Sequence, residues 1–316
     1  MQNPSDFYAA DNTNNLAPQR AMTEPAAILC AGEALADLLH QDGDTWRSHA
    51  GGSTWNVARA LAALGVASGF AGAISRCMAG DALWRASEAA GLDLRYLQRA
   101  ATPRHDIVSG DVAANLHFDV TMMPPGWPHE VQWLHFGGTS LARGPLDLAL
   151  IALAEQAKAH GLRISYDPHW RNLMGPAYDA TLRRMTELAD VIKVSDDDLR
   201  ALFRSHDTLG SLGRLRARNP AALVLLTRGA GGASLYHGAQ TWHAQAPVID
   251  VVDTLGADDA GMAGLIYSLQ QWPDAGMAAH LAFAVAAGSA AGRVAGTHAP
   301  DLGTIRALLD AVAVTG

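Results

Sequence analysis

Short apolar segments alternate along this chain with longer segments whose apolar residues have helical spacing, and this alternation limits the fold more than any other feature. Strands that alternate with helices usually form a parallel sheet with both faces covered. The sequence therefore predicts an α/β fold with a mostly parallel sheet and helices on both faces. Strands are predicted at residues 26–31, 68–73, 131–136, 162–166, 191–194 and 222–227, and helices at residues 55–64, 81–90 and 145–160.

Two stretches interrupt the alternation. Residues 38–50 are polar, and residues 107–120 have the composition of strands without an intervening helix. We expect them to form a small separate β-sheet, a lid, with segments at about 38–50 and 105–130. Residues 1–24 are polar and are predicted to be a disordered tail, so that the folded domain covers residues 25–316.

The composition excludes several classes of protein. Of the 316 residues, 49% are hydrophobic and 17% are charged, which excludes a disordered or collagen-like chain. The net charge of −8 argues against a general nucleic-acid-binding protein. Only two cysteines are present, and neither a targeting signal nor an apolar run of membrane-spanning length is found. We therefore expect a reduced, cytoplasmic protein with no nucleic-acid or membrane partner.

Common nucleotide and hydrolase motifs are missing from the sequence. It contains no P-loop, GxGxxG or GxSxG motif. P-loop NTPases, simple dinucleotide dehydrogenases and α/β-hydrolases are therefore disfavoured.

The most informative segment is residues 251–265, where apolar residues and a threonine lead into Gly256-Ala257-Asp258-Asp259 and then into a helix of small residues. Unpaired amides and the positive dipole end at a helix N-terminus attract phosphate. A carboxylate in the first turn would lie beside that phosphate, in position to take a proton from an attacking hydroxyl. The alternative is a helix start that the acidic residues merely stabilise, and the pattern alone leaves both interpretations open.

Six segments, in order, resemble the motifs of the ribokinase-like (PfkB) sugar kinases, and the resemblance extends over nearly the whole chain from Ile28 onward. The segment Asp253-Thr254-Leu255-Gly256-Ala257-Asp258-Asp259 resembles the C-terminal signature of this family. The others resemble its first-strand motif, its Gly-Gly segment, its Asp-Pro-Asn-x-Arg stretch, its Lys-x-Ser/Asn-Glu-Glu-Glu stretch and its nucleotide-site turn. These five segments are residues 32–37, 51–58, 167–171, 193–199 and 226–232.

The resemblance implies a Rossmann-like sheet with a small β lid, ATP and Mg²⁺ as cofactors, a K⁺ site in some members, and a homodimer formed through the lid. It implies that Asp259 is the catalytic base for a primary hydroxyl. It also implies that the amides of Gly256, Ala257, Asp258 and Asp259 form the anion hole for the γ-phosphate.

The remaining site residues are likewise implied by the resemblance. Each also has a structural alternative, such as a helix cap, a strand-end turn or a surface ion pair. The sugar-binding candidates are Asp37, Gly51, Gly52, Asn56 and Arg171. The nucleotide-binding candidates are Lys193, Ser195, Thr227, Gly229 and Gly232. The metal candidates are Asp198, for Mg²⁺ through water, and Asp253, for a monovalent cation.

The chain departs from the family pattern at several positions. Asp258 stands where glycine is usual, and His169 stands where asparagine is usual. Because a carboxylate near a phosphate is repelled, we expect the Asp258 side chain to point outward.

The resemblance to fructokinase-like members favours an ATP-dependent sugar kinase that phosphorylates a primary hydroxyl of a ketohexose such as fructose. The alternative substrates are 2-keto-3-deoxygluconate, ribose and nucleosides. A non-catalytic sugar- or nucleotide-binding regulatory protein is the alternative of another class.

Overall fold

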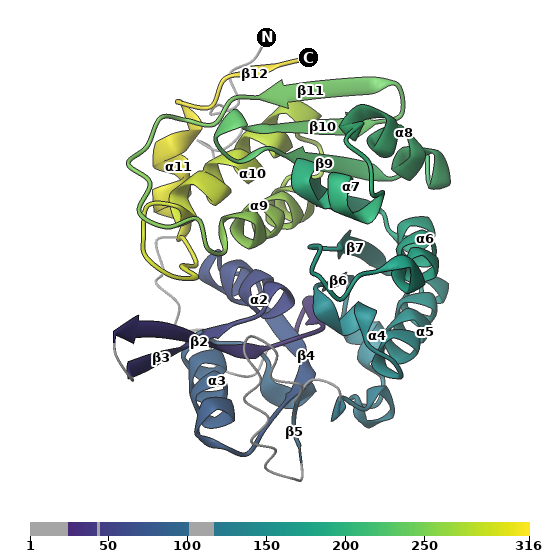
Figure 1. Cartoon of the computed structure of the whole chain (residues 1–316), viewed down its shortest axis with the longest axis vertical. Helices are drawn as coiled ribbons and strands as arrows, with labels where there is room; N and C mark the ends of the chain where they lie inside the picture. The colour runs from purple at the N-terminus through teal and green to yellow at the C-terminus, as the bar shows by residue number, and fades with distance from the viewer. Residues whose placement is uncertain (1–24, 43–44, 101–116) are drawn as a thin grey trace. The chain divides into compact units, whose positions relative to one another are not determined.

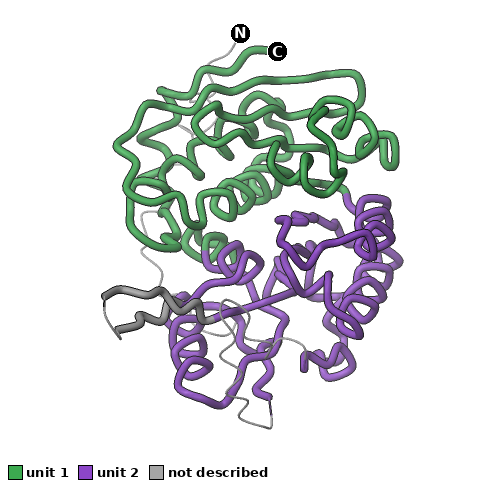
Figure 2. The backbone as a smooth tube through the Cα atoms, in the orientation of Figure 1, with its two compact units in different colours: residues 1–23, 60–66, 190–316 green, residues 24–59, 67–189 purple. Residues whose placement is uncertain are grey.

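The computed structural model describes residues 25–42, 45–100 and 117–316 (Figure 1). Two compact units divide the chain (Figure 2). Unit 2 holds the described residues of 24–59 and 67–189, and unit 1 holds residues 60–66 and 190–316. The division falls within the helix α2 (Ser53–Ala63).

Unit 2 contains five strands that pair in parallel in the order β7-β6-β1-β4-β5. Every residue of β1, β4 and β6 is buried, because both faces of a parallel sheet are covered. The strands are β1 (Ile28–Ala31), β4 (Ser68–Ile74), β5 (Leu97–Arg99), β6 (Trp133–Gly137) and β7 (Arg163–Asp167). The helices are α3 (Met78–Ala89), α4 (Trp127–Glu130), α5 (Leu146–Ala159) and α6 (Asp179–Leu188).

A second, two-stranded sheet belongs to the same unit. It consists of β2 (Leu35–Asp42) and β3 (Thr45–Gly51), which pair antiparallel. The stretch expected at residues 38–50 is thus a hairpin outside the parallel sheet. In the other expected lid segment, residues 105–116 lie outside the described residues. Its described part contains α4 and the 3₁₀ turn Val120–Met122.

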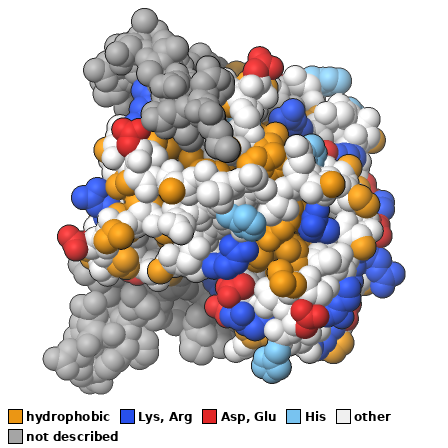
Figure 3. All heavy atoms as spheres, turned by 90° about the horizontal axis from the view of Figure 1, so that it is seen from above, with side chains coloured by type: hydrophobic (Ala, Val, Ile, Leu, Met, Phe, Trp, Pro, Cys, Tyr) orange, Lys and Arg blue, Asp and Glu red, His pale blue; other side chains and the backbone are white. Residues whose placement is uncertain are grey.

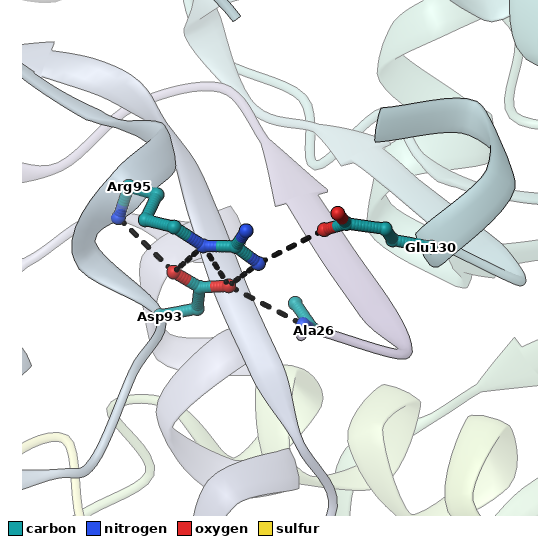
Figure 4. A network of polar contacts seen from close by, with 4 residues as sticks. All are labelled: Ala26, Asp93, Arg95 and Glu130. Carbon is teal, nitrogen blue, oxygen red and sulfur yellow. Dashed lines mark hydrogen bonds and ion pairs between the residues drawn. The ribbon is translucent and has the colours of Figure 1, made fainter. Parts of the chain in front are cut away.

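Asp93 joins three parts of unit 2 (Figure 4). Its carboxylate accepts hydrogen bonds from the Ala26 amide at 3.3 Å and from the Arg95 guanidinium at 2.7 Å. Arg95 also donates to Glu130 of α4 at 3.0 Å. The hydrogen bond to Asp93 raises the pKa of Arg95 above its usual range. This network connects the chain before β1 to the turn before β5 and to α4.

In unit 1, β8 pairs in parallel with β9, and three further strands continue the sheet antiparallel in the order β9-β10-β11-β12. The strands β10 and β11 form a hairpin, with Gly238 in its turn at φ +55°. The strands are β8 (Val191–Ser195), β9 (Leu223–Thr227), β10 (Ala233–His237), β11 (Gln240–Ala244) and β12 (Val314–Thr315). The helices are α7 (Asp196–Leu202), α8 (Thr208–Arg218), α9 (Ala257–Gln271), α10 (Met277–Ala291) and α11 (Leu302–Leu309).

The centre of unit 1 is the pair α9 and α10, and α10 also packs against β10 and β11. Their small residues allow close approach, since a Cβ on Gly264 would lie 2.6 Å from Ala287. A buried hydrogen bond of 2.7 Å joins Ser268 Oγ to His280 Nδ1 across the two helices. Burial lowers the pKa of His280 from 6.5 to about 4.

The α/β fold class is confirmed by the parallel strands of both units and the helices between them. Over the described ranges, none of the helices has both the length and the apolar character needed to cross a membrane. Lys and Arg side chains lie next to Asp and Glu side chains on the face drawn in Figure 3.

Candidate active site

The N-terminus of α9 has the features expected of a phosphate site. Its cap is Gly256, which has a φ of +79° and no side chain that could bond the first amides. The amides of the first turn and the positive end of the helix dipole therefore favour an anion at this end. Glycine suits the cap because other residues rarely adopt this φ, and because a Cβ would lie 3.3 Å from the Thr297 backbone.

Asp259 is the third residue of this helix and is 4% exposed. A carboxylate at this position lies within one turn of the first amides. The arrangement brings a potential base and a potential anion site together, as the motif predicts. Its catalytic role stays a prediction.

Asp258 contacts the buried Lys193 of β8. The distance from Lys193 Nζ to Asp258 Oδ2 is 2.9 Å, and the exposed fractions of the side chains are 0% for Lys193 and 40% for Asp258. The prediction that Asp258 would point outward is wrong, since its carboxylate is directed at this ammonium group. The physical reason is that a buried ammonium is costly without an opposite charge nearby.

The N-terminus of α7 is capped by its own side chains. Ser195 Oγ accepts the Asp198 amide at 2.9 Å, and Asp198 Oδ2 accepts the Ser195 amide at 2.8 Å. This reciprocal capping box satisfies two amides that the helix itself cannot bond. Asp196 and Asp197 form ion pairs with Arg200 on the surface. The roles of Ser195 toward nucleotide and of Asp198 toward Mg²⁺ stay predictions beside this structural role.

The turn after β9 contains Thr227, Gly229 and Gly232. Gly229 and Gly232 have φ values of +52° and +78°, and the Arg228 amide donates to Gly232 O at 2.9 Å. A Cβ on Gly232 would lie 2.1 Å from Ala244 O, so only glycine fits between β10 and the end of β11. The fold therefore explains Gly232 without a ligand, and the nucleotide contacts of this turn stay predictions.

Asp253 stabilises the loop that leads into α9. Its Oδ1 accepts the Leu255 amide at 3.0 Å, and its Oδ2 accepts the Gly296 amide at 2.9 Å. The carboxylate thus holds two loops of unit 1 together. Its role in supporting a monovalent cation stays a prediction.

The sugar-binding candidates are Asp37 on β2, Gly51 at the end of β3, Gly52 between β3 and α2, and Asn56 in the first turn of α2. In the hairpin, Asp37 is opposite His49 and Leu35 is opposite Gly51, so the backbone of Asp37 lies close to the Gly-Gly segment. Gly52 has a φ of +113°, and the Asn56 amide donates to Gly52 O at 2.8 Å. A Cβ on Gly52 would lie 2.4 Å from Glu33 O, which explains this glycine sterically.

Arg171 follows β7 in the segment Asp167-Pro168-His169-Trp170-Arg171. His169 has a φ of +44°, a conformation in which asparagine and histidine are enriched. This accounts for the exchange of asparagine for histidine. The Arg171 guanidinium contacts His169 Nε2 and donates to Trp170 O at 2.9 Å. Arg171 is exposed, and its role toward substrate stays a prediction.

Sequence reasoning missed the role of one buried acid in unit 2, Glu33, which directly follows Gly32 after β1. Its side chain accepts the Ser140 amide at 3.1 Å and the Ser140 hydroxyl at 3.0 Å. Burial raises the pKa of Glu33 above its usual range. A glutamate at the end of an apolar strand was the available signal, because such a group needs buried donors.

Comparisons with known proteins identify the family of this chain. Residues 26–303 match the pfkB family of carbohydrate kinases. A fructokinase of Rhizobium leguminosarum bv. trifolii is 32% identical over 265 residues, which cover 77% of this chain and 79% of that protein.

Two solved structures have a TM-score of 0.79 and 25% identity to this chain. One is the fructokinase of Vibrio cholerae O395 with fructose, ADP and calcium bound, and the match covers 90% of this chain and 99% of that one. The other is the aminoimidazole riboside kinase of Salmonella enterica with aminoimidazole riboside and an ATP analogue, where the match covers 89% and 99%. Because this family match spans most of its length, the chain belongs to the pfkB family of carbohydrate kinases.

Proposed function

We propose that this protein is an ATP-dependent fructokinase, which transfers the γ-phosphate to a primary hydroxyl of fructose. The observation that carries the proposal is the start of α9, where a glycine cap and a buried Asp259 combine an anion site with a base. The fructokinases among its relatives support fructose as the acceptor.

The chemistry follows from these groups. Asp259 takes the proton as the hydroxyl oxygen forms its bond to the γ-phosphorus. The bond from that phosphorus to the bridging oxygen breaks, and ADP leaves with the electron pair. Amides at the start of α9 stabilise the negative charge on the transferred group.

Mg²⁺ prefers carboxylate oxygens and water, and Asp198 offers a buried carboxylate that fits such an ion. When bound, the ion would neutralise charge on the nucleotide's phosphates. Asp198 would hold a water on it, and the capping hydrogen bond from Ser195 would orient this carboxylate.

The test is ADP production from ATP and Mg²⁺ with a panel of acceptors: fructose, ribose, 2-keto-3-deoxygluconate and aminoimidazole riboside. We expect fructose to give the highest kcat/KM. A higher kcat/KM for the riboside would favour a nucleoside-type kinase, the second candidate, which the Salmonella structure supports. ADP production equal to the acceptor-free background with every acceptor would favour the non-catalytic alternative.

We further propose that the β2–β3 hairpin is a lid over the sugar and the contact of a homodimer. Its pairing as a separate sheet supports this role. Closure of such a lid would keep water from the phosphate and so limit ATP hydrolysis. A variant in which residues 39–46 are replaced by Gly-Gly should be monomeric by light scattering and should hydrolyse ATP faster without sugar. A dimer with unchanged hydrolysis would contradict the proposal.

A further inference from the structure

The pair formed by Lys193 and Asp258 lies within the region proposed to receive the phosphate. Lys193 belongs to an apolar strand whose neighbours Ile192 and Val194 are fully buried. Its ammonium group is nevertheless 2.9 Å from Asp258 Oδ2, in the first turn of α9. The helix end where amides and dipole already attract an anion is therefore also in contact with a buried ammonium group.

A carboxylate and a phosphate compete for such a lysine, since both present anionic oxygens to an ammonium group. Asp258 holds the position next to Asp259, in the same turn whose amides would bind the transferred phosphate. Its side chain is 40% exposed and borders solvent, so it can turn away from Lys193 without moving the helix. Lys193 has no exposed surface and belongs to the strand β8.

We propose that Asp258 is a built-in competitor for the nucleotide's terminal phosphate. Its carboxylate occupies Lys193 in the nucleotide-free protein, the terminal phosphate displaces it, and Asp258 thereby lowers the affinity for nucleoside triphosphate. The inference rests on the proposed function, because it takes the start of α9 to be the phosphate site.

The chain offers a matched control for removing this charge. Asp197 is the second residue of α7, as Asp258 is the second residue of α9, and each forms an ion pair. Asp197 differs in being 86% exposed and paired with the surface residue Arg200. Asp258→Asn and Asp197→Asn therefore remove the same charge from the same helical position, and only the first removes an ion pair to a buried lysine.

The experiment is calorimetric titration of the full chain with AMP-PNP, a non-hydrolysable ATP analogue, and with AMP. We expect Asp258→Asn to bind AMP-PNP about tenfold more tightly than wild type, which corresponds to about 1.4 kcal/mol. AMP, which lacks the terminal phosphates, should bind with unchanged affinity. Asp197→Asn should bind both ligands as wild type does, and Asp258→Ser provides a second neutral variant should the asparagine variant fold poorly.

Three results would overturn the inference. Equal AMP-PNP affinity in wild type and both Asp258 variants would mean that the carboxylate does not compete. Weaker binding that appears only with Mg²⁺ would instead make Asp258 a metal ligand. Absence of AMP-PNP binding in every variant would mean that the start of α9 is not a phosphate site. The acceptor panel on wild type is independent, so tighter AMP-PNP binding without fructose phosphorylation would leave this inference standing and reject the proposed substrate.

Discussion

The helices α7 and α9 of unit 1 both begin with adjacent aspartates, yet these aspartates have different partners. At α7, Asp198 bonds the Ser195 amide, and Asp196 pairs with Arg200, all within a few residues. At α9, Asp258 pairs with Lys193 on a distant strand, and Asp259 is buried behind a glycine cap.

The two helix starts therefore differ in how their first amides are capped. The capping box of α7 uses its own side chains to satisfy its first amides. Gly256 supplies no such side chain, so the first turn of α9 retains its attraction for an anion. Substitutions at both helix starts, together with acidification around α9, test this contrast, beginning with the largest expected effect.

Replacing Asp259 should have the largest consequence. We expect Asp259→Asn to lower kcat by about 10²–10⁴-fold, because a general base contributes about this factor. AMP-PNP affinity should be retained, since the amides of α9 remain. Steady-state kinetics with fructose and calorimetry measure the two quantities. Near-normal kcat would reject Asp259 as the base. The acidic residues of α9 would then only stabilise the helix N-terminus, as those of α7 do.

Acidification should destabilise the α9–α10 pair through His280. The pKa of His280 is about 4 in the folded protein and 6.5 in its ordinary state, so the unfolded chain binds the proton more readily. The stability that this histidine contributes is complete above pH 6.5 and is lost as the pH falls toward 4. The loss should reach on the order of 3 kcal/mol.

Urea unfolding at several pH values measures this dependence. His280→Gln should flatten the fall in unfolding free energy between pH 6.5 and 4 relative to wild type. An equally steep fall in the variant would show that other groups cause it.

Neutralising Asp258 should destabilise the protein more than neutralising Asp197. Asp258→Asn leaves the buried Lys193 without this counter-charge, and we expect a loss of about 1–3 kcal/mol. Asp197→Asn breaks an exposed pair, which is worth about 0.3–0.5 kcal/mol. Urea unfolding of both variants at one pH compares the two. Equal losses would mean that burial of Lys193 does not distinguish the two helix starts.

This contrast also explains what could be predicted from the sequence. The strands β1, β4, β6, β7, β8 and β9 and the helix after Gly256 follow from periodicity and glycine positions, since these patterns are local. The short strands β5 and β12 were not predicted. The ordered motifs located the glycine cap and Asp259 for the same reason. The direction of Asp258 was mispredicted because its partner is fixed by the pairing of β8 with β9 and the packing of α9. Lys193 within an apolar strand was the one available signal, because a buried ammonium requires a nearby carboxylate.

Glu33 in unit 2 is a second charged residue whose partner could not be predicted from the sequence. Its partner Ser140 lies far along the chain, and only the pairing of β1 with β6 brings the two segments together. Motif matching located the segment around Glu33 but assigned this residue no role. Helix caps formed by neighbouring residues can thus be predicted from the sequence. The partner of a buried charged residue cannot, when it lies on a distant segment that only the fold brings near.

Removing the cap of α7 should have a smaller effect than neutralising Asp258. Ser195→Ala deletes the hydroxyl that accepts the Asp198 amide at 2.9 Å, and loss of such a cap costs about 1 kcal/mol. If Ser195 only caps α7 and does not contact the nucleotide, the free energy of unfolding should fall by this amount while AMP-PNP affinity stays unchanged. Ser195→Thr retains a capping hydroxyl and should restore most of the stability. If Ser195 also contacts the nucleotide, Ser195→Ala should weaken AMP-PNP several-fold more than AMP. That result would mean that the N-terminus of α7, like that of α9, binds the nucleotide, and the two helix starts would then not differ in function.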